Sequence, residues 1–266
     1  MSKVNKYVDL ISNYYDNTLE DDRLRTRNSH RIEYITTMHF ITKYAPKGCK
    51  ILELGAGTGV YSVELAKMGY DVTAIELVES NLKVLKENAK GVKNIKCLQG
   101  DALDLSRFND NEFDVVLNLG PMYHLYTKDD KDQAIKETLR VCRSGGICMF
   151  AYLTHSSIVW NFGVVKKKMK YLCDFMSDEG VIKDIPEEIF CSYFNEDFNK
   201  QFDKTNSTHI TSVATDGIAE IMRAYINDGV LPDEDYDLLV KWHLATCERL
   251  DHQGLSSHML YICKKD

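Results

Sequence analysis

Short apolar runs alternate with longer amphipathic stretches along the chain from Lys50 onward. Runs such as KILEL have the length of a buried strand, whereas the stretches between them have helical spacing. This alternation predicts βαβ units and a mostly parallel sheet with helices on both faces. Strands are expected at 50–54, 72–76, 95–99, 113–118 and 147–153, and helices at about 59–68, 79–89 and 129–142. Ser144-Gly145-Gly146 is expected to stop the last helix and form a turn.

Two later apolar runs, at 208–214 and 257–263, complete a predicted seven-stranded sheet. The segment SHMLYICKK in the second run suits an antiparallel last strand at the edge of the sheet. The expected organisation is a helical lid segment at 1–45, a core at 46–153, a helical cap at 154–207 and a C-terminal completion of the sheet at 208–266.

The two segments outside the core each contain a predicted amphipathic helix. The first has apolar positions at Ile32, Ile35, Met38 and Ile41. The second runs through the cap with an apolar stripe and a lysine cluster; the stripe is Ile158, Phe162, Val165, Met169, Leu172 and Met176, and the lysines are Lys166, Lys167, Lys168 and Lys170. A solvated face over a packed stripe is favoured over contact with a membrane surface. Either segment can cover a ligand at the carboxyl ends of the strands.

Composition narrows the class of protein. A chain of 266 residues with 44% apolar content can bury one core that carries an insertion. It has no apolar run of ~20 residues and no signal-peptide core at its start, so we expect a cytoplasmic protein that does not bind a membrane. Its formal charge of −7, without a long basic stripe, argues against nucleic acid as a partner. The eight scattered cysteines are expected to be buried, and no histidine or cysteine spacing predicts a metal site.

The strongest chemical signal is the segment Glu53-Leu54-Gly55-Ala56-Gly57-Thr58-Gly59 between a strand and a helix. Glycines permit a tight turn and let a ligand approach the backbone, where the N–H groups of the new helix face it. A dinucleotide site places its third glycine three residues after the second. Here Gly59 follows Gly57 by two, so the spacing disfavours an NAD-dependent oxidoreductase, which stays as an alternative.

The glycine-rich turn resembles the first motif of the class I S-adenosylmethionine-dependent methyltransferases. The resemblance continues with Glu76 at a strand end, Gly100-Asp101-Ala102, Asn118-Leu119-Gly120-Pro121 and a helix-to-strand segment, RVCRSGG. It implies a Rossmann-like seven-stranded α/β sheet. It also implies that S-adenosylmethionine is the cofactor, with S-adenosylhomocysteine as its product. The implied cofactor-binding residues are Glu53, Gly55, Ala56, Gly57, Gly59, Glu76, Leu77, Asp101, Ala102 and Asn118.

The stretch Leu119-Gly120-Pro121-Met122-Tyr123-His124-Leu125 resembles the GPMYHL variant of bacterial small-molecule methyltransferases of the type 11/25 kind, and the segment Trp242–Glu248 fits the same group. The Asn/Asp-Pro-Pro-Tyr tetrad of enzymes that methylate exocyclic amines is absent. The resemblance therefore implies an O-, N- or S-atom of a small molecule as acceptor. A sensor that binds S-adenosylmethionine without catalysis is a further alternative, and the protein is expected to be a monomer or a homodimer.

Methyl transfer from a sulfonium is an in-line displacement that depends mainly on alignment of the acceptor. If the acceptor carries a proton, His124 is the candidate general base, since an imidazole titrates near ~6.5. The competing interpretation is a histidine that binds a loop or the acceptor. Candidate substrate-binding residues are Tyr15, Arg23, Tyr123 and His243, each with a purely structural alternative.

Overall fold

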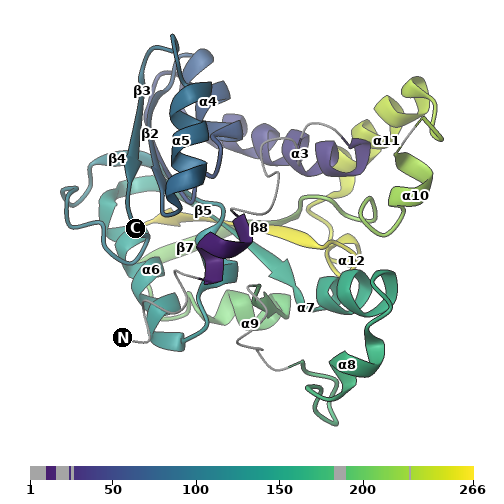
Figure 1. Cartoon of the computed structure of the whole chain (residues 1–266). Coiled ribbons are helices and arrows are strands. Elements are labelled where there is room, and N and C mark those ends of the chain that lie inside the picture. Colours follow the sequence, from purple (N-terminus) through teal and green to yellow (C-terminus); the bar gives the residue numbers. More distant parts are fainter. Residues whose placement is uncertain (1–9, 16–23, 25–26, 183–189, 228) are drawn as a thin grey trace.

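The computed structural model describes residues 10–15, 24, 27–182, 190–227 and 229–266. Its strands are β1 (Lys50–Leu54), β2 (Asp71–Glu76), β3 (Ile95–Gln99), β4 (Phe113–Asn118), β5 (Cys142–Thr154), β6 (Ser192–Tyr193), β7 (Ser207–Ala214) and β8 (His258–Lys265). They form one sheet in the order β3-β2-β1-β4-β5-β8-β7, with β6 paired to β5 (Figure 1). The pairs from β3 to β5 are parallel, and β8 is antiparallel to both β5 and β7.

The helices of the core lie close to their predicted ranges. They are α4 (Val60–Lys67), α5 (Glu79–Asn88) and α6 (Lys128–Val141), with the 3-10 turn η2 (Pro121–His124) before α6. Helices α4 and α5 pack on β2 and β3, and α6 packs on β4 and β5. Strands β1, β2 and β4 are buried at nearly every position because helices cover both faces of the sheet. The predicted Rossmann-like architecture is therefore confirmed.

The expected turn after α6 was wrong. Helix α6 ends at Val141 and the chain enters β5 directly at Cys142. Ser144, Gly145 and Gly146 lie inside β5, where the register with β4 shifts between Phe113 and Val115. Gly145 has φ +73°, so this stretch is an irregularity within the strand.

The expected edge position of the last strand was also wrong. Strand β8 lies between β5 and β7, and β7 forms the edge. In register, Tyr261 is opposite both Phe150 of β5 and Ser212 of β7. Residues 259–263 are all buried, which is the pattern of a strand with neighbours on both sides and covered faces.

The cap does not contain the single amphipathic helix that its spacing predicts. It contains α7 (His155–Ser157), the π-helix η3 (Ile158–Val165) and α8 (Met169–Cys173), followed after the gap in the described residues by α9 (Asn195–Lys200). The chain reverses at 166–168, where Lys167 has φ +57°, and α8 packs back on η3. Of the predicted stripe, Leu172 is buried, whereas Val165, Met169 and Met176 are 47%, 38% and 40% exposed.

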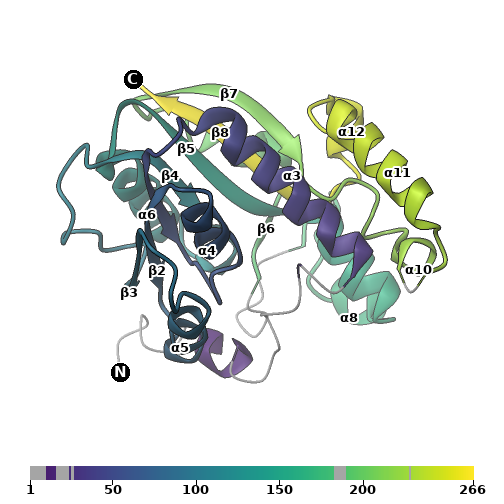
Figure 2. The same cartoon turned by 90° about the horizontal axis from the view of Figure 1, so that it is seen from above.

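The predicted first helix is present as α3 (Asn28–Tyr44), with Ile32 and Ile41 buried. Figure 2 shows α3 beside α10 (Arg223–Ile226) and α11 (Asp233–Thr246), and α12 (Leu250–Gln253) follows α11. The Ser29 N–H donates to Asn227 Oδ1 at 2.8 Å, which fixes the start of α3 to the end of α10. Residues 10–15 are also helical.

Within the described part of the chain, no helix is long and apolar enough to span a membrane. The same residues contain no group of three or more histidine, cysteine, aspartate or glutamate side chains placed to hold a metal. The cysteines are free thiols, and six of the eight are buried, as expected; Cys173 is exposed and Cys97 is partly exposed.

Candidate active site

A cavity of about 990 Å³ lies at the carboxyl ends of the parallel strands. It is lined by residues that directly follow β1, β2, β3 and β4, and by His258 at the start of β8. Because β8 is antiparallel, its first residue lies at the same edge of the sheet as the last residues of β5. Open α/β sheets bind their ligands at this edge, so the cavity is the candidate active site.

The glycine-rich turn gives the cavity a bare stretch of backbone. Gly57 has φ +55°, and a Cβ placed there would meet no atom within 4 Å, so its backbone faces open space. Gly55 has φ +70° and lies so close to the next loop that a Cβ would be 2.8 Å from Cδ of Pro121. Both glycines line the cavity together with Ala56. A ligand can therefore approach the peptide at Gly57 without meeting a side chain.

Gly59, an expected cofactor-binding residue, packs between helices and is not part of the described cavity lining. It has φ +88°, and a Cβ would be 2.2 Å from Cδ1 of Leu85. The third glycine of the motif thus allows α4 to begin tightly against α5, and its contribution to the site is indirect.

Glu76 lies at the end of β2 with a carboxylate held in one orientation. One oxygen accepts the Gly57 N–H at 2.7 Å and the other accepts the Val78 N–H at 2.9 Å. Burial raises the pKa of this carboxyl, and these backbone N–H groups oppose the increase. Each carboxylate oxygen has two lone pairs, so the fixed carboxylate retains acceptor capacity toward the cavity that it lines.

Glu53 lies at the far end of the same turn, in β1. Its side chain is 1% exposed, lines the cavity and accepts a hydrogen bond from the Ser62 hydroxyl. Burial raises the pKa of Glu53 to about 8. A group that is mostly uncharged near neutral pH, next to a cavity, responds strongly to a charge brought beside it.

Leu77, Asp101 and Ala102 also line the cavity, as expected for residues after β2 and β3. Asp101 Oδ1 accepts the Leu103 N–H at 2.9 Å, which stabilises the loop after β3. Asn118 does not line the cavity among the described residues, so the cavity gives no support to its expected contact with the cofactor. Its side chain is buried and donates to Thr138 Oγ1 of α6 at 3.2 Å.

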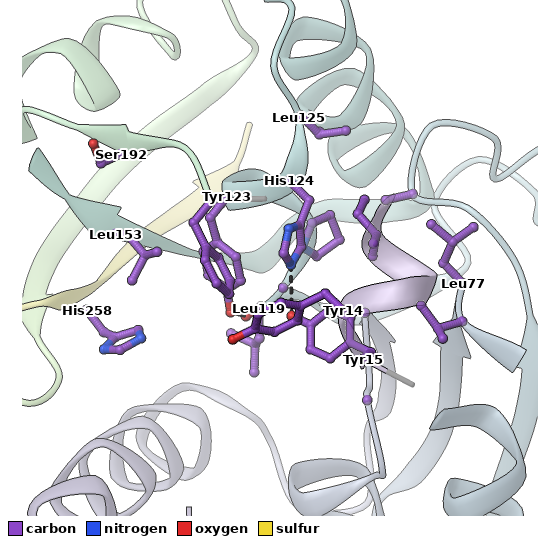
Figure 3. Close-up of a pocket in the computed structure, with 18 of the residues that line it drawn as sticks. Tyr14, Tyr15, Leu77, Leu119, Tyr123, His124, Leu125, Leu153, Ser192 and His258 are labelled. Carbon is purple, nitrogen blue, oxygen red and sulfur yellow. Dashed lines mark hydrogen bonds between the residues drawn. The ribbon is translucent and has the colours of Figure 1, made fainter. Parts of the chain in front are cut away.

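We call the part of the cavity beyond Leu119 the acceptor compartment. It includes Tyr15, Tyr123, Leu153, Phe190, Arg223 and His258. Figure 3 shows Leu153, Ser192 and His258 on one side of Tyr123 and His124, with Leu77 on the other. The compartment is therefore continuous with the part of the cavity formed by the glycine-rich turn.

His124 and Tyr15 form a pair at the junction of the two parts. The Tyr15 hydroxyl and His124 Nε2 are 2.9 Å apart and hydrogen-bonded (Figure 3). The ring of Phe190 lies 5.2 Å from that of His124, and Tyr14 lies edge-on to Tyr15 at 5.3 Å. The structure thus brings Tyr15 together with Tyr123 and His124, although Tyr15 and His124 are 109 residues apart in sequence.

The other two predicted substrate residues do not join this group. His243 is buried, and its ring lies against Gly217, where a Cβ would be 2.9 Å from it. Burial lowers the pKa of His243. It is absent from the described lining of the cavity, so the cavity gives no support to its expected contact with substrate. Arg23 lies outside the described residues.

Sequence reasoning missed a charged cluster in the acceptor compartment. His30 of α3 lies 3.2 Å from Glu220, which also accepts a hydrogen bond from Arg223 at 2.6 Å. His258 Nδ1 is hydrogen-bonded to Asp216 Oδ2 at 2.8 Å, and a carboxylate oxygen of Glu33 lies 3.7 Å from the same nitrogen. No short motif links these residues, because packing of α3 against α10 brings them together.

Part of the chain is similar to known methyltransferases. A family model described as a methyltransferase domain matches residues 52–150. The demethylmenaquinone methyltransferase of Staphylococcus carnosus is 33% identical over 150 residues, which are 55% of this chain and 58% of that protein. The chain spans about half the length of the curated relatives it matches.

Solved structures show the same fold. A methyltransferase from Thermotoga maritima has a TM-score of 0.60 at 15% identity and covers 98% of this chain and 99% of its own. One from Methanosarcina mazei has a TM-score of 0.55 at 17% identity and covers 85% and 96%. The matched family model spans the glycine-rich turn, Glu76 and Asp101. Residues 52–150 therefore match a methyltransferase domain, and the chain has the fold of solved S-adenosylmethionine-dependent methyltransferases.

Proposed function

We propose that this protein binds S-adenosylmethionine at the glycine-rich turn and transfers its methyl group to an O, N or S atom of a small molecule. The observation that carries the proposal is the continuity of one cavity from the bare backbone at Gly57 to the acceptor compartment. A cofactor at the turn and an acceptor in the compartment meet at Leu119. S-adenosylmethionine supplies an activated methyl group on a sulfonium with a good leaving group.

The residues of the turn fit the adenosyl cofactor. Open space at Gly57 accommodates a ligand against the backbone, and Glu76 offers a fixed carboxylate that can accept hydrogen bonds from two ribose hydroxyls. Asp101 and Ala102 line the part of the cavity suited to adenine. The buried carboxyl of Glu53 responds to the positive charge of the cofactor by ionising.

The chain contributes to catalysis mainly by holding the acceptor in line with the methyl group. Holding reacting atoms at roughly 3–3.5 Å accounts for about 7–11 kcal/mol of barrier lowering. For an acceptor that carries a proton, Tyr15 and His124 act as one proton-accepting unit, because the Tyr15 hydroxyl is hydrogen-bonded to Nε2 of His124. The proton leaves the acceptor atom and reaches Nε2 directly or through the Tyr15 hydroxyl.

A small acceptor fits the enclosed compartment better than a macromolecule. Its walls are aromatic and come from residues 10–15, η2 and the cap. The name of the Staphylococcus carnosus relative gives demethylmenaquinone, a small molecule, as the acceptor of that protein. Both points favour a small molecule here.

Calorimetric titration with S-adenosylmethionine, S-adenosylhomocysteine and NAD tests the cofactor assignment. The adenosyl ligands alone should bind, and Glu76→Ala and Gly57→Val should each abolish binding. Gly91→Val is a matched control, because Gly91 has φ +75° and equally open surroundings but does not line the cavity. Binding of NAD, or equal losses in Gly91→Val and Gly57→Val, contradicts the assignment.

Transfer itself is tested by incubating the protein with labelled S-adenosylmethionine and a panel of small phenols, amines and thiols. Labelled product that requires the intact glycine-rich turn supports catalysis. Cofactor binding without turnover across the panel would instead favour a sensor.

A further inference from the structure

We infer that the acceptor compartment recognises an aromatic acceptor with a carboxylate group, and that Arg223 binds this carboxylate. The inference deepens the proposed function and rests on it. It is carried by the guanidinium of Arg223 in the lining of the cavity, by the way the nearby carboxylates are already bound, and by the aromatic rings that line the same cavity.

The cavity is lined by charges of both signs. The part formed by the glycine-rich turn and the loops after β2 and β3 is lined by Glu53, Glu76 and Asp101. The rest of the lining contains three carboxylates and three permanent cations, which are Asp129, Asp130, Glu220, Arg27, Lys166 and Arg223. Of these cations, Arg223 belongs to the acceptor compartment as defined above, and an acceptor carboxylate can therefore meet it there.

The acidic side chains of the cluster are already bound. Glu220 is 8% exposed, accepts from Arg223 at 2.6 Å and lies 3.2 Å from His30 Nε2. Asp216 is 3% exposed; its Oδ1 accepts the Ser257 N–H at 2.8 Å and the Ser256 hydroxyl at 2.6 Å. An amine acceptor would have to displace these bonds, which makes it a poor fit.

Arg223 instead presents donors to the cavity that it lines. Arg223 uses one N–H group for Glu220, and a guanidinium has five N–H donors in a planar fork. A carboxylate matches this fork with two parallel hydrogen bonds.

The aromatic residues that line the cavity are suited to a planar body. Tyr14, Tyr15 and Phe190 pack edge-on or tilted around His124, with ring centroids 5.2–5.7 Å apart. Rings in such arrangements favour another aromatic ring. An aromatic acid held by Arg223 at one end places its opposite end toward His124 and Leu119, where the methyl group is to be transferred.

The test is a calorimetric titration of the S-adenosylhomocysteine-loaded protein with three aromatic acids and their primary amides. The acids are 4-hydroxybenzoate, 3-(4-hydroxyphenyl)propanoate and 4-hydroxycinnamate. At least one acid should bind about tenfold or more tightly than its amide, as expected for a hydrogen-bonded ion pair. Arg223→Gln should reduce this ratio to below about twofold, and Arg223→Lys should restore part of it.

Arg249→Gln is the matched control. It removes the same charge from an exposed arginine paired with Asp251, outside the cavity, and should leave the acid-to-amide ratio unchanged. Urea unfolding of each variant checks that it is folded. Equal affinity for acids and amides, no binding of any acid, or a preference that survives Arg223→Gln would overturn the inference. Binding of S-adenosylhomocysteine is measured first, so its failure would count against the proposed function and not against Arg223.

Discussion

Replacing Glu53 with glutamine should make the free energy of unfolding of the ligand-free protein less dependent on pH. Glu53 is buried at the end of β1, accepts a hydrogen bond from Ser62 and has a pKa of about 8, against an ordinary value of 4.5. Burial is the main cause, and the nearby carboxylate of Glu76 adds to it. Glutamine keeps an acceptor oxygen for the Ser62 hydroxyl but cannot ionise.

The size of the effect follows from the two pKa values. Between pH 4.5 and about 8 the folded chain retains a proton that the unfolded chain releases, so the free energy of unfolding falls as pH rises. At about 1.4 kcal/mol per pH unit, the loss reaches about 3 kcal/mol at pH 7 and about 5 kcal/mol above pH 8. Below pH 4.5 this source of pH dependence disappears.

The assay is urea unfolding of ligand-free wild type and Glu53→Gln at pH 5, 7 and 9. The variant should gain about 4 kcal/mol on the wild type between pH 5 and pH 9. Glu64→Gln, which changes a partly exposed glutamate on α4, is the control and should run parallel to the wild type. If the curves of wild type and Glu53→Gln are parallel, Glu53 is ionised in the folded protein and the reasoning is refuted.

Three further predictions follow from the site. S-adenosylmethionine, as a cation, should favour ionised Glu53, so its binding should release a proton at pH 7 and should tighten as the pH rises to 8. Calorimetry in two buffers measures the proton release, and the same release when S-adenosylmethionine binds the Glu53→Gln variant would contradict the prediction. Gly59→Ala should lower the free energy of unfolding in urea by about 2–4 kcal/mol through contact with Leu85. Gly57→Ala should lower it by only about 1 kcal/mol but should weaken S-adenosylhomocysteine binding, and equal losses of stability in the two variants would refute the distinction. Asn118→Ala should lower the unfolding free energy by about 1 kcal/mol and leave S-adenosylhomocysteine affinity within about twofold, so a large loss of affinity would restore it to the cofactor site.

The parallel half of the sheet could be predicted from sequence because its strands are apolar on both faces. Ile51 and Leu52 are adjacent and both fully buried, which an edge strand or a surface helix does not permit. The same argument applies to residues 259–263, whose continuous burial indicates an interior strand rather than the expected edge. The prediction of a single helix in the cap was wrong because periodicity alone does not mark the reversal of the chain at Lys167.

That the residues at the glycine-rich end of the cavity lie together could be predicted, because they stand in short segments with fixed spacing around β1, β2 and β3. Asn118 lies outside the described lining because successive side chains of a strand point to opposite faces, and its face is set by packing against α6. The cluster of His30, Glu220 and Arg223 had no local signal. His30 is about 190 residues away from Glu220 and Arg223 in sequence, and it meets them because the start of α3 is held to Asn227.

Because β8 is inserted antiparallel beside β5, the two ends of the cavity are formed by different parts of the sequence. Residues 52–150, which the family model matches, contain the glycine-rich turn, Glu76, Asp101 and His124. His258, Glu220 and Arg223 reach the same cavity from beyond that range. Substitutions in the later segments can therefore alter the acceptor end while the cofactor end is untouched, so a new substrate preference can evolve in this scaffold without rebuilding its methyl-donor site.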